Sequence, residues 1–405
     1  MATTVTFKYS VRDKAGKVVT GKLEGESREA VASKLRQMGY IILDLNEDRF
    51  AALSKIQFGT TIKMKDITIF ARQFATMINA GLSLTKCLSI LGGQSESKEL
   101  REVIGQVGRD VEAGQSLSEA MAKHPKPFPP IFINMVRAGE TGGVLDEVLL
   151  RVADHFERDA SLKAKIKSAM TYPVAMGSLV LIVLVAMMVF VVPTFQKMFA
   201  DMGGTLPLPT QILVSISDGV RGWPGVITLV ASIGSYIAFK FWVGTESGRF
   251  IWDGIKLRLP VVGGMVRKLA LARFTRTFGT LVAAGVPILS ALDIVSETAG
   301  NEVVARAVKK VRSAIKEGET IAKPLGESPV FPSMLVQMIA VGEETGALDA
   351  MLSKIADFYD EEVSTAVDGL TSLIEPLMMA TLGVIVGGIV IALYMPMFQV
   401  ITLVK

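Results

Sequence analysis

The chain is poor in the residues from which most enzyme and metal sites are built, because its 405 residues include one cysteine and two histidines. The single thiol, Cys87, excludes an intrachain disulfide and any paired-cysteine metal or redox site. His124 and His155 form no HExxH zinc motif, and the sequence contains no GxSxG motif and no credible Ser-His-Asp arrangement. We therefore predict that the protein is not an enzyme and binds no metal ion and no cofactor.

The chain also lacks an excess of charge of one sign. Its 43 basic and 39 acidic residues leave a net charge of +4, which is too balanced for the basic face of a nucleic-acid-binding protein. The first residues, MATTVTFKYSVRDKAGK, contain no apolar stretch or cleavage site, so we expect no removable signal peptide. GKVVTGKL at residues 16–23 fits seven places of a P-loop, but Leu23 replaces the magnesium-binding hydroxyl and the segment is typical of a hairpin, so we expect no nucleotide there.

Long uncharged runs are abundant, and they indicate a membrane protein. Half of the residues are apolar, and the mean hydropathy is +0.43. The run at residues 168–196, SAMTYPVAMGSLVLIVLVAMMVFVVPTFQ, exceeds the roughly 20 residues that cross a bilayer core. A second run is flanked by Trp223 and Trp242, and a third has EPLMM and PMFQ where the first has YPVAM and PTFQ. We predict transmembrane helices at residues 169–195, 222–242 and 371–400.

The soluble part of the chain contains a duplication. FARQFATMINAGLSL, from Phe70, matches FTRTFGTLVAAGVPI, from Phe274, in both phenylalanines, in Arg72 and Arg276, and in the Ala-Gly break. The similarity continues over about 130 residues, and each copy ends in a span. The helical periodicity predicts two six-helix bundles, at residues 65–168 and 243–370.

Residues 1–50 are predicted to form a small α+β domain. Alternating apolar residues begin at Val5, and the pattern predicts the order strand, strand, helix, strand, with Ser27 capping the helix and Gly39 ending it. Residues 51–64 have weak periodicity and are predicted to be a linker. The expected fold class is therefore mainly α, with a small N-terminal α+β domain, two duplicated six-helix bundles and three transmembrane helices.

The distribution of basic residues predicts the orientation in the membrane, since cytoplasmic segments carry an excess of Lys and Arg. Basic residues precede the first span and follow the second, whereas the connecting segment has only Lys197 and Arg221. We expect the N-terminus and both bundles to be cytoplasmic. The loop at residues 196–221 and the C-terminus are expected on the outer, periplasmic side.

Four candidate partner or packing positions lie at two glycine-rich corners. GETGG, with Gly139 and Glu140, and GEETG, with Gly342 and Glu343, each occur between two predicted helices. In one interpretation the glycine adopts a positive φ and Thr or Glu caps the next helix. In the other, the repeated acidic corner is an exposed surface for a partner.

Three further candidates lie in the third span. Gly383 and Gly387, followed by Gly388, form a flat GxxxG strip that suits close helix packing, either within the chain or between chains. Glu375 begins this span where the first span has Tyr172. A carboxylate at this depth either has a function or meets water at the interface.

Arg72 and Arg276 complete the candidates, because they recur at one position of the repeat. Two acidic sets on the helices that lead into the first and third spans have two interpretations, a divalent-cation site or, with more support, a solvated helical face. These sets are Asp154, Glu157 and Asp159 in the first copy, and Asp357, Asp360, Glu361 and Glu362 in the second.

The chain resembles the inner-membrane platform proteins of type IV pilus machines, the PilC/GspF family that is shared with type II secretion. The resemblance covers nearly the whole chain. It rests on the twinned helix starts with F-x-x-x-F and A-G, the two GE(x)TG corners, KSAMTYP before the first span, VVPTFQKMF and GGTLPLPT after it, and EPLMM before the last. KSAMTYP is more similar to the pilus branch than to the secretion branch.

The resemblance implies a non-enzymatic protein of the bacterial inner membrane that couples cytoplasmic assembly and retraction ATPases to pilin insertion and removal at the pilus base. It implies contacts with hexameric ATPases, pilin subunits, inner-membrane alignment proteins and the lipid bilayer, and a homo-oligomer, with a dimer favoured. The alternatives are a type II secretion platform protein or an oligomeric transporter or channel, whose spans should contain more polar residues. We hypothesise that helices at residues 145–172 and 348–375 transmit conformational work to the spans.

Overall fold

The computed structural model describes residues 5–12, 18–25, 28–37, 39–47, 62–201, 207–260 and 262–403. The chain divides into two compact units, each of which is described by itself. The N-terminal unit comprises Met1–Ile62 with Ser97–Glu99, and the helical unit comprises Lys63–Glu96 and Leu100–Lys405. Most of the predicted linker, residues 51–61, lies outside the described residues.

The N-terminal unit is an antiparallel sheet with one helix. Its elements are β1 (Val5–Arg12), β2 (Val18–Gly25), α1 (Arg28–Gln37) and β3 (Ile41–Glu47). The strand order is β2-β1-β3, so the first strand is central. Phe7 and Val11 of β1 form a buried cluster with Val31 and Leu35 of α1, because alternate residues of a strand share one face. The predicted order strand, strand, helix, strand is confirmed.

Two local predictions in this unit concern single residues that the structure describes. Gly39 has a φ of 83° and follows the end of α1, and the next N–H, of Tyr40, donates to the carbonyl of Leu35 at 3.2 Å. Leu23 lies within β2 opposite Phe7, so the described part of the segment that resembles a P-loop, residues 18–23, belongs to a strand. The predicted N-cap, Ser27, lies outside the described residues.

The first bundle has an aromatic core. Its helices are α3 (Met64–Asn79), α4 (Leu84–Gln94), α5 (Lys98–Glu112), α6 (Leu117–Ala122), α7 (Pro130–Gly142) and the start of α8 (Leu145–Ala186). Phe70 lies 5.4 Å from Phe74 and 5.7 Å from Phe128 between ring centroids, and Phe132 lies 5.6 Å from Phe156. Each buried ring contributes about 1.5–3 kcal/mol, which holds the short helices on α3 and α8.

The second bundle repeats the first. Its helices are α13 (Val262–Ala283), α14 (Ile288–Thr298), α15 (Glu302–Lys316), α16 (Ala322–Gly326), α17 (Ser333–Thr345) and the start of α18 (Leu348–Leu403). Phe274 lies 5.9 Å from Phe278 and 5.1 Å from Phe331, in the same sequence positions as the first cluster. Within the described residues each copy has six helices in the same order, which confirms the predicted duplicated six-helix bundles.

A further helix, α12 (Glu246–Arg258), packs on α15 of the second bundle. Asp253 is 3% exposed and accepts a hydrogen bond from the N–H of Glu302 at 2.7 Å, at the start of α15. The guanidinium of Arg306 lies 4.0 Å from the ring centroid of Phe250. These contacts extend the second bundle toward the preceding span.

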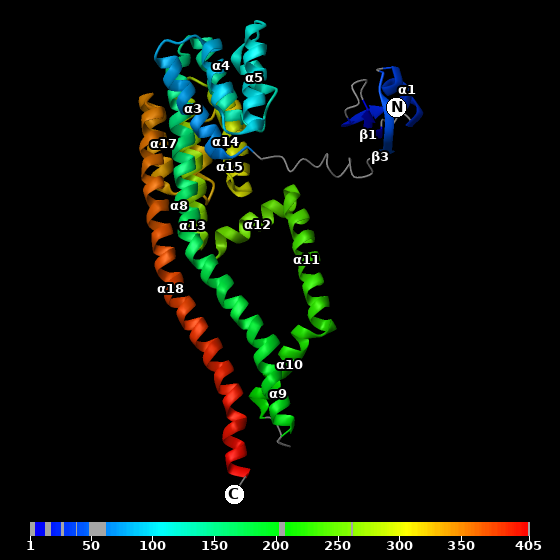
Figure 1. The fold of residues 1–405 in the computed structure, drawn as a ribbon. Helices are drawn as coiled ribbons and strands as arrows, with labels where there is room; N and C mark the ends of the chain where they lie inside the picture. Colours follow the sequence, from blue (N-terminus) through cyan, green and yellow to red (C-terminus); the bar gives the residue numbers. More distant parts are fainter. Residues whose placement is uncertain are drawn as a thin grey trace. The chain divides into compact units, whose positions relative to one another are not determined.

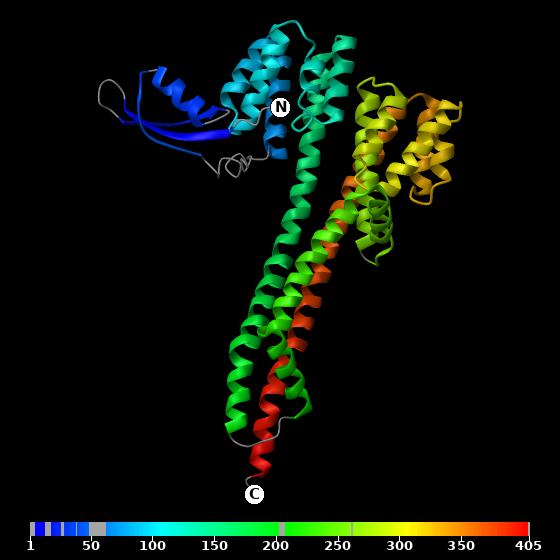
Figure 2. The same cartoon turned by 90° about the vertical axis from the view of Figure 1, so that its right-hand side faces the viewer.

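Two long helices connect the bundles to the apolar part of the helical unit. α8 and α18 lie side by side as they leave the bundles (Figure 1). Both bundles lie at the same end of these helices, opposite the C-terminus (Figure 2). Three helical segments among the described residues are long and apolar enough to cross a membrane, namely Leu145–Met198, Trp223–Gly244 and Leu348–Met395.

The segment predicted as a loop, residues 196–221, is largely helical. α8 continues through a π-helical turn, η1 (Met187–Val191), into α9 (Val192–Asp201), and α10 (Leu208–Arg221) precedes the second span, α11 (Trp223–Gly244). The described part of the connection between the two spans is therefore structured, and the simple loop prediction is wrong there.

α10 packs against the ends of the first and third spans. Its buried apolar side chains share one cluster with α9 and α18. The hydroxyl of Thr210 donates to the carbonyl of Ala392 in α18, and that of Ser217 to the carbonyl of Met188 in η1, each at 2.5 Å. Ser217 thus supplies a donor where the regular helical ladder is interrupted by the π-helical turn.

Candidate functional site: arginine clusters and capped corners

In the first copy, Arg72 of α3 holds two carboxylates of α8. Its Nε and Nη2 atoms donate to the two oxygens of Glu157, each at 2.6 Å, and Nη2 also donates to Asp154 Oδ1 at 2.5 Å. The planar guanidinium fits this two-point contact. Hydrogen bonding with Arg72 lowers the pKa of Glu157, and hydrogen bonding with the carboxylates raises the pKa of Arg72, so the cluster is ionised at neutral pH.

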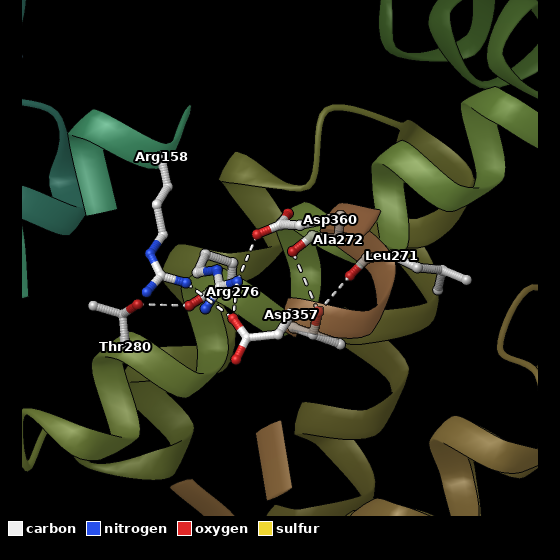
Figure 3. A network of polar contacts seen from close by, with 8 residues as sticks. Arg158, Leu271, Ala272, Arg276, Thr280, Asp357 and Asp360 are labelled. Carbon is white, nitrogen blue, oxygen red and sulfur yellow. Dashed lines mark hydrogen bonds and ion pairs between the residues drawn. The ribbon is translucent and has the colours of Figure 1, made fainter. Parts of the chain in front are cut away.

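In the second copy, Arg276 of α13 occupies the same place. Its Nη2 atom donates to Asp357 Oδ1 at 2.7 Å and to Asp360 Oδ2 at 2.5 Å, and Arg158 reaches from α8 to the same Asp357 oxygen at 2.9 Å (Figure 3). Burial alone would raise the pKa of Asp357, but the hydrogen bonds and charges of Arg276 and Arg158 outweigh it, and the pKa is lowered. The structure thus brings both predicted arginines onto the acidic helices.

Within the described residues, six of the seven residues in the two acidic sets, all except Glu361, are partners of basic side chains. Besides the four carboxylates held by arginine, Asp159 pairs with Lys163 at 2.7 Å and Glu362 with Lys268 at 2.6 Å. In the part of the chain that the structure describes, no group of three His, Cys, Asp or Glu is placed to hold a metal ion. The geometry therefore favours ion pairing within and between helices over a divalent-cation site.

Two ion pairs join α8 to α18. Arg158 pairs with Asp357, and Lys165 pairs with Asp368 at 3.0 Å and also donates to Ser364. Lys165 and Asp368 occupy the same position of the two repeats, so the copies have opposite charges there. Exposed pairs of this kind contribute about 0–1 kcal/mol each, so their main effect is on the register of the two helices.

The sequence prediction did not include this contact between α8 and α18. The repeat does contain a sequence feature that indicates the contact between α8 and α18, because Lys165 in one copy corresponds to Asp368 in the other. Opposite charges at equivalent positions indicate that two duplicated helices have become complementary. Such a pair is recognised only when both helices are already assumed to be neighbours.

Glu140 and Glu343 stabilise helix starts. Glu140 accepts a hydrogen bond from the N–H of Leu117 at 2.5 Å and one from the next N–H at 3.2 Å. Both oxygens of Glu343 accept from the N–H of Ile321 at 2.9 Å. First-turn N–H groups have no intrahelical acceptor, and a carboxylate there is favoured. The prediction that the corner caps the next helix is wrong, because the capped helices, α6 and α16, precede it.

The glycines of the corners have two separate roles. The positive φ belongs to Gly143, at 69°, and Gly346, at 70°, rather than to Gly139 and Gly342. Gly139 and Gly342 lie inside α7 and α17, where a Cβ would come within 3.1 and 3.0 Å of the first Cα atom of α8 and α18 respectively. These two positions therefore permit a close approach of each corner helix to the following long helix.

Replacing Glu343 with alanine is expected to destabilise the second bundle by about 1–3 kcal/mol, because N–H groups at the start of α16 lose a charged acceptor. Its exposed neighbour Glu344 is the matched control, since Glu344→Ala removes the same charge without removing the cap. Thermal unfolding of the full-length variants, followed by circular dichroism, measures the difference. Equal unfolding temperatures for the two variants would contradict the capping role.

Comparison with known protein families assigns the chain to a family. The family described as type II secretion system (T2SS), protein F matches residues 70–193 and 274–396, and the N-terminal domain of that protein matches residues 1–46. The chain belongs to the type II secretion system protein F family. Each long match begins at a core phenylalanine of α3 or α13 and ends in a span, so the repeated unit of this protein F family member is a bundle together with its span.

Full-length relatives of this protein F family member come from both pilus and secretion systems. Type IV pilus assembly protein PilC of Myxococcus xanthus is 43% identical over 403 residues, covering 98% of this chain and 95% of that protein. PilC of Thermus thermophilus is 42% identical over 399 residues, covering 98% of each. Type II secretion system protein F of Pseudomonas aeruginosa is 32% identical over 397 residues, covering 97% and 98%.

The predicted residues of the third span make no contact with other parts of the described chain. Glu375 is exposed on α18 and makes no hydrogen bond or ion pair with another described residue. No described atom outside the helix lies within 4 Å of the Cβ position at Gly383, Gly387 or Gly388. The structure therefore shows no packing on the glycine strip within the described chain, and contact between chains stays a prediction.

Proposed function

We propose that this protein is the inner-membrane platform of a type IV pilus assembly machine. The observation that carries the proposal is similarity over nearly the entire chain to proteins named for type IV pilus assembly, which exceeds the similarity to the secretion protein. The three apolar helices support a multi-pass location in the inner membrane of a bacterium. The protein would couple cytoplasmic ATPases to the insertion and removal of pilin.

In this proposal different partners bind at the two ends of the long helices α8 and α18. The bundles and the N-terminal unit contact hexameric assembly and retraction ATPases, and the spans contact pilin subunits within the bilayer. Inner-membrane alignment proteins are further partners, as is a second copy of the chain, for which the open glycine strip is a candidate contact. The continuity of α8 and α18 supports this division, because a displacement of a bundle moves the attached span.

Deletion of the gene in its own host, with complementation by the intact gene, tests the function. Loss of surface pili and of twitching, with secretion unchanged, is expected. Loss of secretion with normal pili would assign the protein to the secretion branch and contradict the proposal. Retention of a hexameric ATPase on purification separates a platform from a transporter, which needs a small-molecule substrate instead.

The proposed orientation, with the N-terminus and both bundles cytoplasmic and the C-terminus periplasmic, has its own test. A reporter enzyme that is active only outside the cytoplasm should be active when fused after Gly204, between the first two spans. The same reporter should be inactive when fused after Gly300, in the second bundle. The reverse pattern would contradict the orientation while leaving the family unchanged.

A further inference from the structure

Two adjoining cavities lie between the first and second bundles, where α8 faces α13. Their volumes are about 220 Å³ and 300 Å³. His155 and Arg158 of α8 and Arg276 of α13 line both cavities, and Arg273 of α13 lines the smaller one. The region between the bundles is therefore hollow. The guanidinium groups of Arg158, Arg273 and Arg276 line the smaller cavity, and Arg151 is a further arginine of the larger one.

Arg273 has no counterion among the residues that the structure describes. It makes no hydrogen bond or ion pair with any of them, and its Nε atom is buried. Its guanidinium lies against Gly300, where a Cβ would come within 2.4 Å of Nη1. The Nε atom of Arg276 is also buried without an acceptor, although Nη2 of the same residue holds Asp357 and Asp360. Both arginines thus keep donors unused at the cavity.

His155 adds a further unused polar atom, because its Nδ1 is buried without a hydrogen-bond partner in the described structure. Burial lowers the pKa of His155 to about 4; Asp159 raises this pKa, and Arg276 and Lys163 lower it. The ring is neutral at physiological pH and carries one N–H donor. The acidic residues of the smaller cavity, Asp159 and Asp360, are already held by Lys163 and Arg276.

Arg273 is half-buried, and its buried Nε has no acceptor in the described structure. A partly buried guanidinium without an anion is unfavourable, whereas an anion placed beside it gains charge-assisted hydrogen bonds. Arginine is also the side chain best suited to phosphate, since its planar fork matches two phosphate oxygens. We propose that the smaller cavity between the bundles binds a small, soluble, phosphate-bearing anion through Arg273 and Arg276, with Arg158 and His155 completing the contact from α8.

The dimensions of the site limit the ligand. The smaller cavity lies below the roughly 300–1,000 Å³ of pockets for drug-sized molecules, so it fits inorganic phosphate, pyrophosphate or the phosphate group of a small ester. Arg158 precedes the predicted start of the first span, residue 169, by about 16 Å of helix. A soluble phosphate therefore fits the place better than a lipid headgroup does.

Binding would act on the arrangement of the two bundles. The ligand bridges α8 of the first copy and α13 of the second, and these helices otherwise meet around a hollow. An anion in the cavity thus clamps the bundles together, and its release frees them. The site would make the coupling between the duplicated bundles responsive to a cytoplasmic phosphate compound.

The test uses the full-length protein in detergent, labelled with ¹³C and ¹⁵N in histidine and titrated with inorganic pyrophosphate against sodium chloride of equal ionic strength. The sequence has two histidines, so His124 serves as an internal reference. A saturable shift of the His155 ring signals is expected, with half-saturation at or below about 1 mM. Arg273→Gln should weaken binding at least about tenfold, and Arg306→Gln, which removes an arginine away from the cavity, should leave it unchanged.

A stability measurement distinguishes a lost site from a misfolded variant. Because Arg273 has no partner to lose, Arg273→Gln should unfold without pyrophosphate at the same or a higher temperature than the unaltered protein. Pyrophosphate should then stabilise the unaltered protein and not the variant. The proposal is overturned if His155 does not respond, or if both proteins respond equally. It is also overturned if phosphatidylglycerol nanodiscs alone cause the Arg273-dependent shift, because the phosphate would then come from a lipid.

Discussion

A flexible Gly-Ser segment inserted after Ser161 is expected to abolish pilus assembly while both bundles remain folded. Ser161 lies in the uninterrupted helix α8, beyond Phe156, the last of its buried residues, and before the predicted span at residue 169. The insertion therefore leaves the core of the first bundle intact and interrupts only the connection to the membrane. If a rigid helix transmits movement of the bundle to the span, a flexible segment within that helix prevents the transmission.

The same insertion after Gly81 is the matched control. Gly81 lies in the exposed turn between α3 and α4 with a φ of 83°, and exposed turns tolerate added residues. This variant should assemble pili and unfold at the temperature of the unaltered protein. Surface pili counted by electron microscopy, together with the amount of full-length protein in the membrane fraction, provide the comparison.

The insertion also displaces Lys165 from Asp368, and a second variant separates this effect from the loss of continuity. Lys165→Ala removes the ion pair but keeps the helix, and exposed pairs contribute only about 0–1 kcal/mol. Normal assembly with Lys165→Ala and none with the insertion would identify the unbroken helix as the requirement. Normal assembly with the insertion after Ser161 would argue against transmission through α8.

The duplicated architecture can be predicted from sequence because its determinants are local and occur twice. Phe70 and Phe274 begin matching amphipathic patterns, and a pattern that recurs after a long interval indicates a repeated structural unit. Long apolar runs likewise predict spans, because a bilayer requires a minimum length of helix. The order of the N-terminal strands and helix follows from the change of period along the chain.

The connection between the first two spans is harder to predict. The buried residues of α10, including Thr210, Leu213, Val214 and Ser217, recur at helical spacing, but two of them are polar and weaken the apolar signal. Their hydroxyls are used by carbonyls of α18 and η1. Only the packed structure reveals those acceptors, so the sequence alone leaves the segment as a loop.

The capping roles of Glu140 and Glu343 escape sequence rules for a similar reason. Capping rules search within a few residues of a helix start, whereas Glu140 reaches back 23 residues and Glu343 reaches back 22. The cavities between the bundles are even harder to predict from the sequence, since they depend on contacts between residues of different copies. The sequence predicts helices and their apolar faces, but the polar contacts between distant elements require the structure.

Replacing Gly342 with valine is expected to destabilise the second bundle by roughly 1–3 kcal/mol, the usual cost of overpacking a close contact. A Cβ at this position would lie 3.0 Å from the Cα atom of Leu348 and 3.1 Å from the Cβ atom of Met351. The first of these is backbone, so relief requires α18 to move away from α17. Because α18 continues into the third span, the displacement should also reduce pilus assembly.

Alanine substitutions at two helical glycines give the sharpest control. Gly342→Ala introduces the same crowded Cβ and should lower stability, although less than valine does. Gly254→Ala, in α12, places a Cβ where no described atom lies within 4 Å, so it should raise stability by about 0.5–1 kcal/mol through the better helix propensity of alanine. Unfolding temperatures measured in one detergent should therefore shift in opposite directions. A shift in the same direction for both variants would mean that the approach of α17 to α18 does not depend on the missing side chain.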